Sequence, residues 1–255
     1  PEFPSFPEKL FTHFDRQSVL RYGENPHQSA AFYGDPTCQA SCVGRSIKLA
    51  GKALSFNNIV DTDAALECVR QFDAPACVIV KHANPCGSAI DKSISAAYKR
   101  AFEADPTSAF GGIIAFNRSL DTATAALILK QQFVEAVIAP GVEQGVIELF
   151  EKKPTIRLVT VGALDQIPRQ MDYRRIQGGL LIQDADTGCR SRDDLTCVTD
   201  IKPSEKQIDD LLFAWKLAKF VKSNAIIYAK NNQTIGIGAG QMSRVYSARV
   251  AGLKA

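Results

Sequence analysis

Two kinds of apolar run alternate along the middle of the chain, and this alternation most constrains its fold. Apolar residues recur at helical spacing from Asn57 to Phe72 and are followed, after Pro75, by the short β-rich run 76–80. The same succession of helix and buried strand continues along the chain. The further expected helices cover residues 94–104, 122–131 and 142–152, and the further expected strands cover residues 113–116, 134–139 and 156–161. This pattern predicts an α/β layered fold with a largely parallel sheet.

A second unit is expected to begin near residue 202. Ser204 and Gln207 have the spacing of a capping box, and an apolar helical pattern continues to Val221. That helix leads into the expected strand 225–229, as the helix ending at Phe72 leads into 76–80. We interpret the two places as a weak internal repeat.

Composition and charge argue against several classes of protein. The chain has 255 residues, of which 45% are hydrophobic, enough for one large core or two medium ones. No apolar run approaches the ~18 residues that cross a bilayer, and the start of the chain lacks the pattern of a signal peptide. The net charge of +3 is spread along the sequence. We therefore expect a cytoplasmic protein without nucleic-acid or membrane partners.

The seven cysteines form an odd set without the spacing of a disulfide framework. Reduced thiols are therefore expected. A structural zinc ion is disfavoured, because Cys38 and Cys42 have no second pair of ligands nearby.

The segment from Lys81 to Gly87 is the first candidate site. It follows an apolar strand and places a cation, an imidazole, an amide and a thiol close together. In parallel sheets, ligands bind beyond the carboxyl ends of strands. The imidazole of His82 could act as a base near pH 7. The alternative is a loop whose polar groups only satisfy the backbone.

Three further segments carry weaker signals. The segment 21–28 collects hydrogen-bond donors in a turn and contains an arginine that could bind a phosphate, although alone it is only a polar loop. The glycines of 108–112 would allow close approach of a ligand or form a tight turn. Segment 236–244 begins Gly-x-Gly-x-Gly, which departs from the dinucleotide-binding fingerprint, so a redox enzyme fits poorly.

Two alternative chemistries centre on the first candidate segment. Cys86 could be a nucleophile beside Lys81 and His82, although buried free cysteines are common. The segment also resembles part of a zinc deaminase signature. Asn84 stands where that signature needs Glu, and Ala89 stands where it needs its second Cys. A zinc-deaminase-like hydrolase therefore lacks its proton carrier and one ligand.

Taken together, these motifs resemble the transformylase half of the bifunctional AICAR transformylase/IMP cyclohydrolase family, in its bacterial form. The resemblance is carried, in order, by residues 21–28, 81–87, 108–112, 138–141, 222–230 and 236–244. It implies a cytidine-deaminase-like three-layer α/β/α fold that is duplicated, with the second copy incomplete in this sequence. It also implies a homodimer whose active sites are assembled from both subunits.

The resemblance implies formyl transfer from the cosubstrate 10-formyltetrahydrofolate to the 5-amino group of AICAR. In this reading His82 is the base, and Lys81 stabilises the oxyanion or protonates the leaving folate nitrogen. Glu135 stands where relatives use Asp, and Cys86 stands where other members have a small residue, which favours packing. The residues implied to bind AICAR are Arg21, Tyr22, Gly111, Glu135 and Asn224, and Arg244 is implied to bind the folate. No catalytic metal is expected, and a structural potassium ion is compatible with the family.

The resemblance also suggests how the chain is divided. Residues 1–30 are expected to be a lead-in from a cyclohydrolase domain, 31–201 a first deaminase-like domain, and 202–255 the start of a second. We expect IMP cyclohydrolase activity to belong to a domain outside this sequence. The 255-residue chain alone is expected to have little transformylase activity, and a non-catalytic nucleotide-binding fragment is the second alternative.

Overall fold

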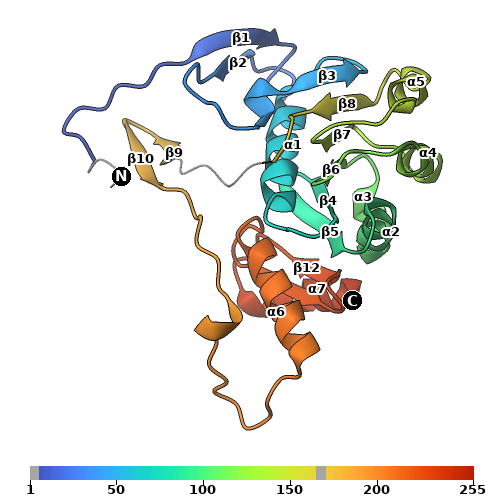
Figure 1. Cartoon of the computed structure of the whole chain (residues 1–255). Coiled ribbons are helices and arrows are strands. Elements are labelled where there is room, and N and C mark those ends of the chain that lie inside the picture. The colour runs from blue at the N-terminus through green and yellow to red at the C-terminus, as the bar shows by residue number, and fades with distance from the viewer. Residues whose placement is uncertain (1–5, 165–170) are drawn as a thin grey trace.

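A six-stranded sheet forms the centre of the computed structural model, which describes residues 6–164 and 171–255 (Figure 1). Its strand order is β3-β8-β7-β6-β4-β5. The strands are β3 (Ile47–Ala50), β4 (Ala76–Lys81), β5 (Asn84–Ile90), β6 (Ile113–Phe116), β7 (Ala136–Ala139) and β8 (Arg157–Thr160). Every residue of β6 and β7 is buried. Such continuous apolar runs are expected where both faces of a sheet are covered.

Helices cover both faces of this sheet. On one face, α1 (Phe56–Val69) packs on the sheet through a core that includes Leu66, and α6 (Glu205–Ala218) joins the same core through Leu217. On the other face, Tyr98, Ile128 and Phe150 pack from three helices. Those helices are α2 (Ile94–Ala104), α4 (Thr122–Gln131) and α5 (Val146–Glu151), and the short α3 (Pro106–Ala109) follows α2. The predicted α/β fold with three layers is therefore confirmed.

The prediction of a largely parallel sheet is wrong. Only the pairings of β7 with β6 and β8 are parallel among the described strands of this sheet, whereas β4 runs antiparallel to both β5 and β6 and β3 runs antiparallel to β8. The sequence pattern missed β5 because Asn84, Pro85 and Gly87 are residue types that strands disfavour. The chain therefore turns back after β4 in a hairpin before it enters α2.

Two further hairpins lie outside the central sheet. β1 (Asp15–Leu20), in the expected lead-in 1–30, pairs with β2 (Ala30–Gly34), which begins at the end of that lead-in. β9 (Met171–Ile176) pairs with β10 (Gly179–Asp184), and this hairpin stands apart from the central sheet in Figure 1. Residues 1–5 of the expected lead-in and residues 165–170 lie outside the described residues. Short 3-10 turns occupy Val43–Arg45 and Arg192–Asp194.

The internal repeat is present as four elements in the same order. The first copy runs α1, β4, β5, α2, and the second runs α6, β11 (Ile226–Ala229), β12 (Thr234–Gly238) and α7 (Arg244–Lys254). In both copies the two strands form an antiparallel hairpin. The domain boundaries at 31, 201 and 202 stay predictions.

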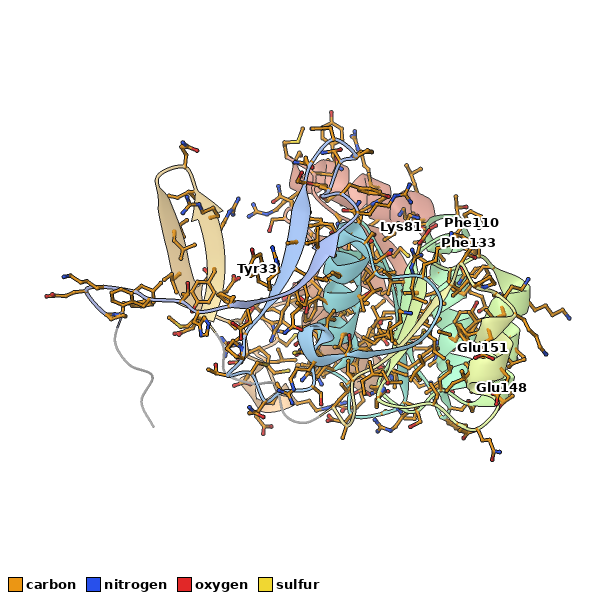
Figure 2. The ribbon with its side chains drawn as sticks, turned by 90° about the horizontal axis from the view of Figure 1, so that it is seen from above. Tyr33, Lys81, Phe110, Phe133, Glu148 and Glu151 are labelled. Carbon is orange, nitrogen blue, oxygen red and sulfur yellow. The ribbon has the colours of Figure 1, made fainter. Side chains whose placement is uncertain are left out.

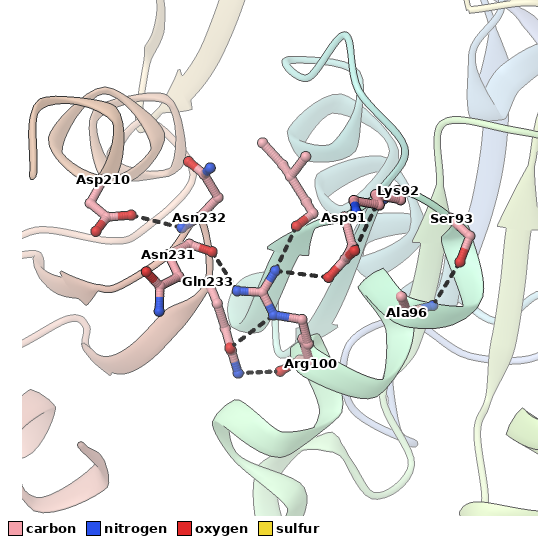
Figure 3. A network of polar contacts seen from close by, with 10 residues as sticks. Asp91, Lys92, Ser93, Ala96, Arg100, Asp210, Asn231, Asn232 and Gln233 are labelled. Atoms are coloured by element: carbon pink, nitrogen blue, oxygen red, sulfur yellow. Dashed lines mark hydrogen bonds and ion pairs between the residues drawn. The ribbon is translucent and has the colours of Figure 1, made fainter. Parts of the chain in front are cut away.

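The two copies meet through the edges of β5 and β12. Ala89 forms an antiparallel bridge with Gln233, and the N–H of Ile90 donates to the carbonyl of Asn232 at 3.0 Å. Arg100 of α2 reinforces this contact, since its Nε donates to Oε1 of Gln233 at 3.2 Å and its guanidinium also reaches Asp91 at 3.0 Å (Figure 3). The two copies are thus joined by backbone pairing and by the hydrogen bonds of the Arg100 guanidinium.

No helix within residues 6–164 and 171–255 has the length and apolar character that crossing a membrane requires.

Close packing of strand on helix depends on glycine in both copies, at Gly87 in the first and at Gly236 and Gly238 in the second. A Cβ added at Gly87 of β5 would lie 1.9 Å from the carbonyl oxygen of Ala101 in α2. A Cβ added at Gly236 of β12 would lie 2.1 Å from the carbonyl oxygen of Ala251 in α7. Both atoms are backbone, so neither can move aside without shifting its helix.

We predict that Gly87→Ala lowers the free energy of unfolding by about 3 kcal/mol, because α2 must move away from the sheet. Urea unfolding followed by circular dichroism measures this change. Gly188→Ala is the control, since its new Cβ would lie 3.5 Å from the flexible carboxylate of Asp186 and should change stability little. Equal stability of the two variants would contradict the packing argument.

Candidate functional site

The antiparallel direction of β4 determines which edge of the sheet carries the candidate residues. Val80 pairs with Ile113, Ile113 with Ala136, and Ala136 with Arg157. The carboxyl end of β4 therefore lies beside the amino ends of β6, β7 and β8. The expectation that Lys81 and His82 lie at the carboxyl ends of parallel strands is wrong for this reason.

His82 lies in a tight turn between β4 and β5. Lys81 pairs with Asn84, which leaves His82 and Ala83 as the loop, and their φ angles are 52° and 55°. Two left-handed residues in succession are typical of a type I′ turn, which favours Asn and Gly. For other residues this conformation costs about 1 kcal/mol or more each. The turn presents the His82 side chain to solvent.

Hydrogen bonds from two side chains stabilise this turn. The Asp61 carboxylate, on α1, accepts the N–H of Ala83 at 2.7 Å. Nδ2 of Asn84 donates to the carbonyl of His82 at 2.9 Å, and Oδ1 of Asn84 accepts the N–H of Lys222 at 3.1 Å. The turn is therefore fixed both to α1 and to the segment that precedes β11.

The ammonium group of Lys81 is held by the loop before β6. Its Nζ donates to the carbonyls of Phe110 at 3.2 Å and Gly111 at 2.9 Å. Gly111 has a φ of +68°, and a Cβ there would lie 3.0 Å from Nζ. The ring of Phe110 packs against Phe133 with centroids 5.8 Å apart, and Figure 2 shows Lys81 beside these two rings. A lysine has three N–H donors, so these contacts leave one for a ligand.

Glu135 lies at the same edge, just before β7, and is paired with Arg157. Its Oε2 is 2.6 Å from Nη1 of Arg157, whose side chain is mostly buried. The Arg157 guanidinium also donates to the carbonyls of Ala53 and Thr155. The Glu135 carboxylate is thus fixed in place, at the edge where Lys81 lies.

Arg21 and Tyr22 line a cavity of about 470 Å³ that reaches Arg157. The Arg21 guanidinium lies 5.5 Å from the centroid of the Tyr22 ring. Lys48 and Lys52 complete a cationic lining that contains no carboxylate among the described residues. No local sequence pattern indicates Lys48, Lys52 or Arg157, because the antiparallel pairing of β3 with β8 brings these residues together. The cavity suits an anionic ligand.

Asn224 and Arg244 lie on adjoining segments of the second copy. Nδ2 of Asn224 donates to the carbonyls of Gln241 at 2.9 Å and Met242 at 3.1 Å. Arg244 is the first residue of α7 and is exposed. The N–H of Lys222 donates to Oδ1 of Asn84, next to the His82 turn. Asn224 follows Lys222 by two residues, so this hydrogen bond links the Asn224 segment to the turn.

The structure therefore joins some candidate residues directly and others only through intermediates. Lys81 contacts Gly111, and His82 adjoins Lys81 in the same turn. Arg21 and Tyr22 line the same cavity as Arg157, and Arg157 forms an ion pair with Glu135. No hydrogen bond or ion pair between described residues joins Arg21 or Tyr22 to the His82 turn.

Cys86 is better explained by packing than by nucleophilic catalysis. It is buried, its thiol lies 3.5 Å from the carbonyl of Ile79, and burial raises its pKa to about 12. A thiol with such a pKa is almost entirely protonated near neutral pH, whereas the thiolate is the nucleophile. Across residues 6–164 and 171–255, no three His, Cys, Asp or Glu side chains are grouped so as to hold a metal ion.

A larger apolar cavity, of about 930 Å³, lies away from these residues. It is lined by the segment 195–203 together with parts of α6, β11 and β12, and it includes none of the candidate residues. Size alone therefore does not identify the site; the grouping of charged and titratable side chains does.

Comparison with known families agrees with the motifs and covers almost the whole chain. A family model described as AICARFT/IMPCHase bienzyme matches residues 2–254. The match includes the β4–β5 turn, the loop that holds Lys81, the cationic cavity and the second copy of the repeat. The chain therefore belongs to the AICARFT/IMPCHase bienzyme family, a family of purine biosynthesis enzymes.

Proposed function

We propose that this protein carries the catalytic turn of an AICAR formyltransferase, which transfers the formyl group of 10-formyltetrahydrofolate to the 5-amino group of AICAR. The observation that carries the proposal is the 2.9 Å hydrogen bond from Nζ of Lys81 to the carbonyl of Gly111. Lys81 directly precedes the turn that presents His82. Two candidate catalytic residues, which are neighbours in sequence, meet one candidate substrate-binding residue, Gly111, which lies 30 positions after Lys81. Family membership supports the same reaction class.

His82 is suited to act as the base of this reaction. The AICAR amine is a poor nucleophile, because its electrons are delocalised into the imidazole carboxamide, so its proton must leave as the nitrogen attacks. The exposed His82 imidazole can reach a ligand at the edge of the sheet. It would take the proton of the amine as the new N–C bond forms.

Lys81 is suited to stabilise the negative charge that develops on the formyl oxygen. Two of its N–H donors are directed to the carbonyls of Phe110 and Gly111, which fixes the ammonium group in position for the third. When the tetrahedral intermediate collapses, the bond between the formyl carbon and N10 of the folate breaks. N10 takes up a proton either from the Lys81 ammonium, which is its alternative role, or from protonated His82, which carries the proton of the amine. The products are FAICAR and tetrahydrofolate.

The remaining candidate residues are suited to bind the two substrates. The cationic cavity lined by Arg21 and Tyr22 would bind the phosphate of the AICAR nucleotide, and Lys52 and Arg157 add positive charge. Glu135 and Asn224 would bind AICAR through their carboxylate and amide groups. The exposed guanidinium of Arg244 would bind the folate.

The proposal also includes a homodimer. A structural potassium ion is compatible with it, and no step of the proposed reaction uses that ion. Exposed apolar side chains on the first hairpin, Val19 and Tyr33, are compatible with a second subunit. No observation favours the zinc hydrolase or the non-catalytic module. Asn84, which replaces the deaminase Glu, is already used in hydrogen bonds of the turn.

We predict that His82→Ala lowers kcat for formyl transfer by about 100- to 10,000-fold while AICAR binding changes little. The assay uses the intact enzyme, meaning these residues with any natural flanking sequence, and follows tetrahydrofolate formation. Calorimetric titration with AICAR measures binding. His13→Ala is the control, because His13 is exposed and pairs with Asp15 in the N-terminal segment. Unchanged turnover of His82→Ala would remove His82 from the proposed role.

We predict that Gly111→Ala lowers kcat/KM by roughly 10-fold more than Gly145→Ala. Both glycines have positive φ, at +68° and +89°, so both variants have similar backbone strain. Only the Cβ at Gly111 would displace the Lys81 ammonium, from which it would lie 3.0 Å. Equal kinetic effects of the two variants would show that the position of Lys81 does not matter for the reaction.

A further inference from the structure

The His82 turn has a structural counterpart in the second copy of the repeat. Lys230 and Gln233 flank a loop of Asn231 and Asn232, whose φ angles are 54° and 55°. The corresponding angles of His82 and Ala83 are 52° and 55°. The two turns therefore have the same left-handed backbone but different residues.

The residues of the second turn suit this backbone, and those of the first do not. Asparagine tolerates the left-handed region better than other non-glycine residues, because its short side chain can hydrogen-bond locally. Ala83 has no such group, and His82 directs its imidazole to solvent. A left-handed conformation at unsuitable residues persists only where the surrounding contacts enforce it.

An aspartate on the preceding helix supplies that contact in both copies. Oδ1 of Asp61, on α1, accepts the N–H of Ala83 at 2.7 Å. Oδ1 of Asp210, on α6, accepts the N–H of Asn232 at 2.7 Å, as Figure 3 shows. Both aspartates are half-buried. The helix thus anchors the second loop residue in the same way each time.

We propose that Asp61 is a positioning residue for His82. Its carboxylate fixes the Ala83 N–H, which holds the left-handed turn and so directs the imidazole toward the ligand. Asn84 provides the second restraint, since it donates to the His82 carbonyl and accepts from Lys222. The kinetic part of this inference rests on the proposed function, whereas the structural part does not.

The second copy provides a matched control for this inference. Asp61→Ala and Asp210→Ala remove the same hydrogen bond from the same kind of turn, so both should lower the free energy of unfolding by similar amounts. Only Asp61→Ala should affect formyl transfer. We expect it to lower kcat by roughly 10- to 100-fold with little change in KM for AICAR, because the base is misplaced and not lost. Asp210→Ala should change kcat less than about 2-fold.

A second variant tests the mechanism of positioning. In the background of Asp61→Ala, Ala83→Gly should restore most of kcat, because glycine adopts positive φ without the Cβ penalty. Failure of this rescue would show that Asp61 acts otherwise than through the turn. Equal loss of kcat in Asp61→Ala and Asp210→Ala would reduce Asp61 to a purely structural role.

A measurement independent of activity separates this inference from the proposed function. The chain contains three histidines, so the imidazole signal of His82 can be assigned by NMR with His82→Ala. We expect Asp61→Ala to shift or broaden that signal and Asp210→Ala to leave it unchanged. An unchanged His82 signal in Asp61→Ala would overturn the inference. Full turnover of His82→Ala would instead overturn the proposed function and leave the NMR result standing.

Discussion

The antiparallel pairing of β4 with β6 is the constraint on which the rest of the site depends. It places the carboxyl end of β4 beside the amino end of β6, so the Lys81 ammonium lies within hydrogen-bond distance of the Gly111 carbonyl. A parallel β4 would put Lys81 and His82 at the opposite edge of the sheet, far from Glu135 and Arg157. The direction of a single strand therefore decides which side chains can act together.

The repeat shows how one scaffold can carry different chemistry in its two copies. Each copy contains a close strand-on-helix contact at a glycine and a left-handed turn anchored by a helix aspartate. The second turn has asparagines, which suit the backbone, and it packs against Arg100 of the first copy. The first turn has His82 instead, at a cost in local conformational energy. A departure from the favoured residue type thus marks the copy in which we place the catalytic base.

Contacts within the protein hold three charged groups of the candidate site, Lys81, Glu135 and Arg157, in fixed positions. Lys81 is held by two carbonyls, and Glu135 by Arg157. Arg157 in turn lines the cavity that contains Arg21 and Tyr22. Fixed charges of this kind stabilise developing charge more effectively than mobile ones, because they need not reorganise during the reaction. The same arrangement explains why Gly111 must lack a side chain.

The sequence by itself determined the α/β class, most helices and buried strands, the repeat, the family resemblance and the candidate segment 81–87, because apolar periodicity and short motifs are local signals. It did not determine the direction of β4. The hairpin partner of β4, β5, contains residue types that strands disfavour, so the hairpin was not predicted. Nor did it show Asp61, Lys52 or Arg157, which reach the site from other elements. Only the tertiary structure decided those, because strand pairing brings together residues that no sequence spacing relates.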